Sequence, residues 1–279
     1  MAGSSRKRRG PSRRSLVLDS IYPPEPVPLW SATVDAAREA FFAHCALDAA
    51  CAASFRDLSA IYRVAVSRLA QEPLALELPP QLHRYGERAQ LTADLFEILV
   101  SRLLYFPPSY PMLPPIIKFV SEGNGRDLGR IIAAQMTAAS TQSRGAHAAV
   151  ECRDRPHFRQ PLPASARVLD RLQLYGICEQ WVELGPAPLV PTGTRVPTLV
   201  LAGEFDPVAR PAQARGVTDM IGQASHLIAF PRLGHNIRQF SPCGARIAAE
   251  FINDPDRMPD SSCVDRRPPI AFTAKREAP

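Results

Sequence analysis

The sequence predicts an α/β fold made of the last strands of a mostly parallel sheet together with a large helical insertion. A strand, a helix and a second strand follow one another within about 30 residues after Pro197, which is typical of a parallel βαβ unit. One more strand, over residues 16–20, precedes a long stretch with helical periodicity. Because three strands are too few for a sheet with helices on both faces, we expect the sheet to be incomplete within this chain.

The first strand is a short apolar run that begins at Leu16. Polar residues end it at Asp19 and Ser20, and Pro23-Pro24 follow. A short apolar run that is ended by turn residues is typical of a buried strand that leads into a loop.

Between this strand and the βαβ unit, apolar residues recur at three-to-four spacing, which predicts helices that face a core. The predicted helices cover residues 32–45, 54–70, 91–104, 127–139 and 164–182. The segment from Thr141 to Pro163 is rich in Ser, Arg, His and Pro and is predicted to be a loop.

The βαβ unit has a clear sequence signature. Residues Thr198–Gly203 form an apolar run, Pro211–Ile221 begin with a proline that suits the first turn of a helix, and His226–Phe230 form a second apolar run. The order predicts two parallel strands with a crossing helix between them.

Composition and charge favour a globular protein. The chain has 279 residues, of which 46% are apolar, enough for a substantial core. Its net charge of +6 comes from six basic residues among the first fourteen, and the rest of the chain has 27 basic and 27 acidic side chains. Since the fold itself is formally neutral and no run approaches the roughly 20 apolar residues that span a bilayer, we expect neither a nucleic-acid nor a membrane partner. One alternative stays open, a non-enzymatic protein that binds polyanions through the basic arm at residues 1–14.

The six cysteines form an even set of three sequential pairs, which predicts disulfides and an oxidising compartment. They are Cys45 and Cys51, Cys152 and Cys178, and Cys243 and Cys263. His147, Cys152 and His157 lack a fourth ligand, so no metal site is predicted there. The basic start is not followed by the apolar region or the cleavage site of a signal peptide, so the export that the cysteines favour has no visible signal.

Two residues that follow strands have the chemistry of a catalytic site. Asp206 comes directly after the first strand of the βαβ unit, and His235 follows the second strand. Ligands of open α/β sheets lie beyond the carboxyl ends of the strands, so both residues are expected at one edge. A carboxylate beside an imidazole fixes its tautomer and stabilises the imidazolium, and the order acid then histidine matches the late part of the order Ser, Asp, His.

These motifs resemble a known family. Val196–Pro207, with Asp206, and then Gly234-His235 and the Pro242-Cys243 helix resemble the C-terminal domain of the tripeptidyl aminopeptidase-like serine peptidases, which are α/β hydrolases related to prolyl iminopeptidases. Leu16–Pro24 resembles the strand after the nucleophile helix of the family, and Cys45 with Cys51 resembles the cysteine pair of its cap. Cys178–Trp181 resembles the segment in which the cap returns to the core. The similarity runs from about residue 15 to about residue 274.

The resemblance implies a domain organisation. It consists of a basic arm at 1–14, a core strand and loop at 15–30, a helical cap at 31–185, a C-terminal hydrolase core at 186–274 and a tail at 275–279. The family removes short peptides from free amino termini, without a metal or other cofactor. Such substrates imply an acidic anchor in the cap, and Asp154 lies near the position where the resemblance would place one.

The nucleophile of the family is expected before the first strand, in a Gly-x-Ser-x-Gly motif that the sequence does not contain. The nearest approach, Gly3–Lys7, has a lysine where a small residue is needed, and it lies too close to Leu16 for the helix that should intervene. We therefore expect a truncated hydrolase that is inactive alone. The alternative is one half of a split or frameshifted enzyme, completed by an upstream chain that supplies the serine and the oxyanion hole.

Overall fold

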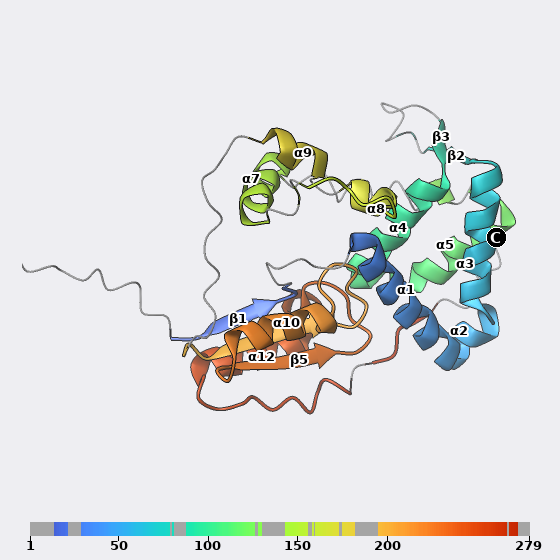
Figure 1. Cartoon of the computed structure of the whole chain (residues 1–279). Helices are drawn as coiled ribbons and strands as arrows, with labels where there is room; N and C mark the ends of the chain where they lie inside the picture. The colour runs from blue at the N-terminus through green and yellow to red at the C-terminus, as the bar shows by residue number, and fades with distance from the viewer. Residues whose placement is uncertain are drawn as a thin grey trace, which may run out of the picture.

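The computed structural model describes residues 14–21, 29–78, 80, 88–125, 128–129, 143–155, 158, 160–172, 175–181, 195–266 and 268–272. Figure 1 shows a small sheet with its own helices on one side of the molecule and a group of helices on the other. Within the described residues, no helix combines the length and the apolar character needed to cross a membrane.

The sheet is parallel and has a central strand that is buried on both faces. Its strands lie in the order β1 (Leu16–Asp19), β4 (Thr198–Gly203) and β5 (Ser225–Phe230). Leu199 and Leu201 of β4 pack in the cluster that contains α12 (Pro242–Asn253), whereas Val200 and Ala202 pack against α10 (Pro211–Ile221). The alternation of side chains along β4 therefore places one helix on each face of the sheet, as a doubly covered α/β layer requires.

The second region is helical. Its elements are α1 (Trp30–Leu47), α2 (Ala49–Ser54), α3 (Leu58–Gln71), α4 (Ala93–Tyr105), the 3₁₀ helix η2 (Pro107–Met112) and α5 (Leu113–Glu122). The apolar stripes of these helices meet in one core around Phe41, Phe96 and Ile116, all fully buried. An antiparallel hairpin of β2 (Leu74–Glu77) and β3 (Arg88–Leu91) joins α3 to α4.

A smaller helical group follows in the chain. It contains α7 (Arg144–Asp154), α8 (Val168–Arg171) and α9 (Tyr175–Gln180). A disulfide between Cys152 and Cys178 joins α7 to α9, and Figure 1 shows these two helices side by side.

The helical region and the sheet meet at a ring that projects from the end of β4. Phe205 makes edge contacts with Phe41 of α1 and Tyr110 of η2, with ring centroids 5.3 and 5.7 Å apart. Phe205 is fully buried and belongs to the core of the helical region although it follows a strand of the sheet. The loop after β4 is therefore anchored in the helical region, and this anchor determines where the next residue, Asp206, lies.

The structure confirms all three predicted strands, the helix of the βαβ unit and the helices predicted over residues 32–45, 54–70 and 91–104, with small shifts of their ends. Two predictions were wrong. The predicted loop from Thr141 to Pro163 contains α7, and the single helix over 164–182 is instead two short helices, α8 and α9. Most of the helix predicted over 127–139 lies outside the described residues, as do residues 1–13 of the basic arm and the tail. The predicted domain boundaries stay predictions.

Candidate functional site

Asp206 lies directly after β4 and is fully buried. Its Oδ1 accepts hydrogen bonds from the backbone N–H groups of Val208 and Ala209, at 2.8 and 3.0 Å. This arrangement is an Asx turn, in which the side chain accepts hydrogen bonds from the backbone of the residues that follow it. Because both donors belong to the backbone of the same loop, the carboxylate has a fixed orientation and its second oxygen points away from the turn.

His235 lies on the loop after β5, and its ring meets that second oxygen. The distance from His235 Nδ1 to Asp206 Oδ2 is 2.9 Å. A carboxylate only accepts hydrogen bonds, so Nδ1 carries the proton and Nε2 is left as an acceptor in the neutral ring. The His235 side chain is 15% exposed, and within the described residues no hydrogen bond reaches Nε2. The two predicted site residues are thus in contact, and the reactive nitrogen faces outward.

Two glycines allow the loops after β4 and β5 to approach each other. A Cβ atom on Gly203 would collide with the backbone carbonyls of Leu233 and Gly234. A Cβ atom on Gly234 would collide with the Leu104 carbonyl and with the hydroxyl of Tyr110. Any larger residue at either position would therefore push the histidine loop away from Asp206 or from the helical region.

Hydrogen bonds between the same two loops fix their relative position. The N–H of Phe205 donates to the Leu233 carbonyl at 2.8 Å, and the N–H of Arg232 donates to Glu204 Oε2 at 3.0 Å. Arg232 has a positive φ of 56°, a backbone conformation that residues with side chains adopt at a cost. These hydrogen bonds therefore hold the loop of His235 on the side of β4, independently of any contact that the imidazole ring makes.

The carboxyl end of β1 holds the same loop from the other side. Asp19 accepts hydrogen bonds from the backbone N–H groups of Ile237 and Arg238, at 2.9 and 3.0 Å, at the start of the short helix α11 (Ile237–Phe240). The hydroxyl of Ser20 accepts a bond from the N–H of Asn236 at 2.9 Å and donates to Asp19 Oδ1 at 3.1 Å. All three strands therefore contribute to positioning the loop of His235.

Ser20 has the position of a nucleophile, because it is a serine at the end of a strand. It is buried and has a positive φ of 57°, as a residue on a sharp turn after a strand does. Its hydroxyl proton, however, points to Asp19, and its other contact is with a backbone N–H. Ser20 therefore orients the loop and has no hydrogen bond with His235.

Tyr105, at the end of α4, covers one face of the histidine ring. The two ring centroids are 4.2 Å apart and the planes differ by 20°. The backbone N–H of His235 also donates to the Tyr105 carbonyl at 3.3 Å. The sequence did not single out Tyr105, Asp19 or Ser20; the one available signal was that Asp19 and Ser20 end a strand at the same edge as Asp206 and His235.

Asp154, predicted as a substrate anchor, is the last residue of α7. Within the described residues, no hydrogen bond or ion pair joins it to Asp206 or His235. Its role stays a prediction. Of the three residues weighed as metal ligands, Cys152 is committed to a disulfide and His157 lies outside the described residues.

The three predicted disulfides are confirmed. The pairs are Cys45 with Cys51, Cys152 with Cys178, and Cys243 with Cys263. No cysteine is left free. Three disulfides in one chain indicate an oxidising environment.

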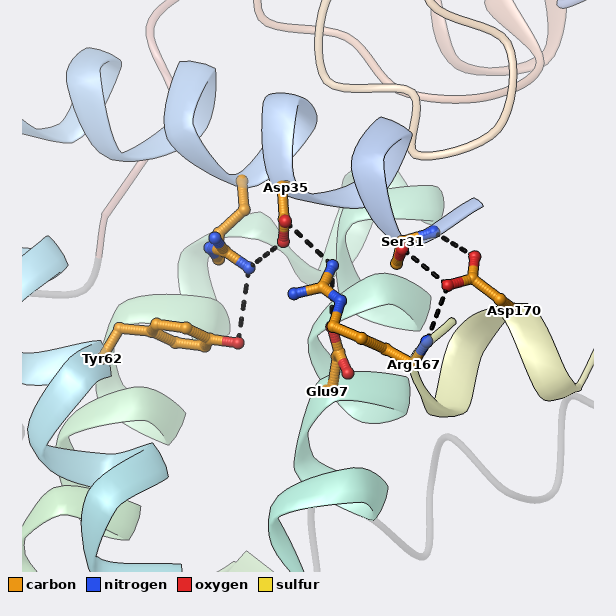
Figure 2. A network of polar contacts seen from close by, with 7 residues as sticks. Ser31, Asp35, Tyr62, Glu97, Arg167 and Asp170 are labelled. Carbon is orange, nitrogen blue, oxygen red and sulfur yellow. Dashed lines mark hydrogen bonds and ion pairs between the residues drawn. The ribbon is translucent and has the colours of Figure 1, made fainter. Parts of the chain in front are cut away.

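A second group of charged residues lies between α8 and the helices of the helical region (Figure 2). Asp170 of α8 is fully buried and accepts hydrogen bonds from the N–H and the hydroxyl of Ser31 and from the N–H of Arg167. The guanidinium of Arg167 lies 2.8 Å from Asp35 Oδ2 and 3.2 Å from Glu97 Oε1. These contacts join α8 to α1 and α4.

Comparison with known families finds a match over part of the chain. A family model described as TAP-like protein, which belongs to the α/β hydrolases, matches residues 164–263 and so includes both Asp206 and His235. Residues 164–263 are therefore similar to the α/β hydrolases, and the parallel sheet agrees with that class. No curated protein matches it.

Proposed function

We propose that this chain carries the acid and the histidine of a serine peptidase of the tripeptidyl aminopeptidase-like type, and that it is inactive alone because it lacks the nucleophile and the oxyanion hole. The supporting observation is the contact of 2.9 Å between Asp206 and His235 at the carboxyl edge of the sheet, with Nε2 of the histidine free to accept a proton.

The chemistry follows from this geometry. In a serine hydrolase, a histidine nitrogen takes the proton of the serine hydroxyl as that oxygen attacks a carbonyl, and later returns the proton to the leaving amine. His235 Nε2 would take this role, and Asp206 would stabilise the imidazolium through Nδ1–H; the contact between His235 Nδ1 and Asp206 Oδ2 supports this assignment. The helical region would form the cap over the site, and peptides with a free amino terminus would be the substrates, with Asp154 as a candidate anchor.

A labelling experiment tests the inactivity of the chain alone. Purified protein is treated with a fluorophosphonate probe and assayed on peptide aminoacyl reporter substrates. We expect neither labelling nor turnover, because the sequence contains no Gly-x-Ser-x-Gly motif to activate a serine. A labelled serine that requires His235, shown by loss of the label in His235→Gln, would overturn the proposal.

The free edge of β1 supports a second candidate, in which another chain completes the enzyme. β1 pairs only with β4 among the described strands, and all four of its residues are half-buried. Such an edge has unpaired backbone groups that another strand can use. Since Asp19 and Ser20 connect the end of β1 to the loop of His235, a parallel strand added here would end close to the same loop.

Co-expression tests this candidate. The chain is produced together with the product of the adjacent upstream reading frame, if that frame encodes a Gly-x-Ser-x-Gly motif. Fluorophosphonate labelling that appears only in the mixture, and that His235→Gln abolishes, would support a split enzyme. A mixture that stays unlabelled although the two chains copurify would contradict it.

A further inference from the structure

We propose that Tyr105 is a positioning residue for His235. The ring of Tyr105 holds the imidazole in the orientation in which Nδ1 meets Asp206 and Nε2 faces outward. This inference rests on the proposed function of His235 and adds a residue from the helical region to a site otherwise formed by strand ends.

A single hydrogen bond does not fix an imidazole ring. The bond from Nδ1 to Asp206 Oδ2 anchors one atom of the ring, and the ring could still tilt about the axis of that bond. The Tyr105 ring lies against one face of the imidazole, 4.2 Å between centroids and 20° from parallel, and so opposes this tilt. The bond from the His235 N–H to the Tyr105 carbonyl fixes the backbone at the same position. Tyr105 thus contacts both the main chain and the side chain of His235.

Tyr105 is itself held by a well-bonded helix end. The last turn of α4 has carbonyl groups that lack partners within the helix, as every helix does. The hydroxyl of Tyr110 donates to the Leu104 carbonyl at 3.1 Å. The hydroxyl of Ser109 lies 2.6 Å from the carbonyl oxygens of both Leu103 and Phe106, which share its one proton. Because η2 closes back on α4 in this way, the ring of Tyr105 is presented from a fixed support.

The ring also suits the charge that the proposed reaction creates. The imidazole becomes a cation when Nε2 takes a proton, and the face of an aromatic ring attracts a cation. A tyrosine or phenylalanine provides this face, whereas an aliphatic side chain of similar size fills the space without it. The chemistry therefore predicts that Tyr105→Phe keeps the orientation of the His235 ring and that Tyr105→Leu loses it.

The adjacent residue provides a matched control. Phe106 follows Tyr105 at the same helix end, is 40% exposed, and contacts Phe240 edge-on at 5.3 Å between centroids. Phe106→Leu therefore removes an aromatic ring from the same turn, and no ring contact with His235 is lost.

Nuclear magnetic resonance of the purified chain tests the proposal. Three signals are followed in wild type, Tyr105→Phe, Tyr105→Leu and Phe106→Leu: the ring-current shifts of the His235 carbon-bound protons, the Nδ1–H signal, and its exchange rate with water. In Tyr105→Leu we expect loss of the ring-current shift and exchange of Nδ1–H that is faster by about tenfold, on the order of the worth of one aromatic contact. Tyr105→Phe and Phe106→Leu should match wild type. Tyr105→Met serves in place of the leucine variant if that variant does not fold.

The outcomes separate the two proposals. An unchanged Nδ1–H exchange rate in folded Tyr105→Leu or Tyr105→Met would overturn the positioning role. Fast exchange in Phe106→Leu as well would also overturn it, since the effect would then belong to the helix end in general. If Asp206→Asn leaves the His235 signals unchanged, the acid–histidine pair itself is wrong, and the proposed function fails independently of Tyr105.

Discussion

Helix α8 of the smaller helical group and the loop after β4 of the sheet each contain a fully buried carboxylate that accepts three hydrogen bonds, and the two carboxylates differ in one donor. Asp170 accepts from two backbone N–H groups and a serine hydroxyl. Asp206 accepts from two backbone N–H groups and an imidazole. The donors to Asp170 are backbone N–H groups and a hydroxyl, which do not titrate near neutral pH. The imidazole that donates to Asp206 has a second nitrogen near the surface. Burial and hydrogen bonding alone therefore make a carboxylate structural, whereas a titratable partner with a second nitrogen near the surface makes it a candidate for catalysis.

The largest expected effect is on stability, in Asp170→Asn. Asp170 Oδ1 accepts from the Ser31 N–H, and Oδ2 accepts from the Ser31 hydroxyl and the Arg167 N–H. An amide nitrogen in place of Oδ2 faces the Arg167 N–H, so two donors meet in a buried site. We expect the free energy of unfolding to fall by about 3 kcal/mol, measured by urea denaturation. A loss below about 1 kcal/mol would mean that α8 does not depend on this carboxylate.

Asp206→Asn should destabilise the protein less than Asp170→Asn does, but it should change the protonation of the neighbouring histidine. The asparagine Oδ1 can keep both backbone hydrogen bonds, since Val208 and Ala209 donate to the same oxygen. Its amide nitrogen then faces His235 Nδ1 as a donor, so the ring must carry its proton on Nε2 instead. We expect a stability loss of about 1 kcal/mol together with a switch of tautomer, detected by the nitrogen chemical shifts of His235. Retention of the Nδ1–H tautomer would contradict the assigned hydrogen bond.

Arg167→Met tests whether the charges around Asp170 also titrate. Burial raises the pKa of Glu97, and the guanidinium of Arg167 opposes this rise. The folded wild type therefore already binds a proton at Glu97 more strongly than the unfolded chain does, and loss of Arg167 enlarges this difference. Stability should then decrease more steeply than in wild type as the pH rises above about 4.5. Because the Arg167 side chain is 41% exposed, we expect a loss of at most about 1 kcal/mol at neutral pH.

The double variant Arg167→Met with Glu97→Gln is the control for this effect. It removes Glu97 as a titrating group, so the additional pH dependence of the single variant should disappear while the other contacts of α4 remain. Urea denaturation curves below and above pH 4.5 provide the measurement. An equal loss at both pH values in the single variant would assign the effect to packing of the arginine side chain.

The smallest expected effect concerns His44, which lacks the carboxylate contact that His235 has. Its Nε2 is buried without a hydrogen-bond partner among the described residues. Burial, and then the positive charge of Arg232, lower the pKa of His44 below 6.5. The unfolded chain therefore takes up the proton first, and stability should fall as the pH drops below 6.5. His44→Gln should show a smaller decrease in the midpoint of urea unfolding across this range than wild type.

The sequence was sufficient for Asp206 and His235 because both follow strands whose carboxyl ends must share one edge. Tyr105 could not be predicted in this way. It lies 130 positions before His235 in the chain, at the end of an apolar helix, and only the contact between the end of α4 and the loop after β5 brings the two rings together. Contacts between regions of different periodicity leave no pattern in the sequence that joins them.

The errors in the fold have local physical causes. The segment that contains α7 has a loop-like composition, yet Ala148 and Cys152 stand four positions apart and are both buried, and the hydroxyl of Ser143 caps the first turn. The sequence does not predict the hairpin of β2 and β3 because neither strand contains a β-branched or aromatic residue and each buries only one residue. Each strand of the hairpin gains its backbone partners from the other, so neither has a strong signal alone.

The three disulfides each close a short stretch of chain, with separations of 6, 26 and 20 residues, and none joins the helical core around Phe41 to the sheet. The covalent cross-links are therefore inherited together with the segments that they stabilise. In evolution, the region between β1 and β4 could be exchanged or enlarged by recombination without leaving an unpaired thiol behind. Such an exchange would have to preserve two features, the aromatic contacts around Phe205 and an aromatic ring over His235.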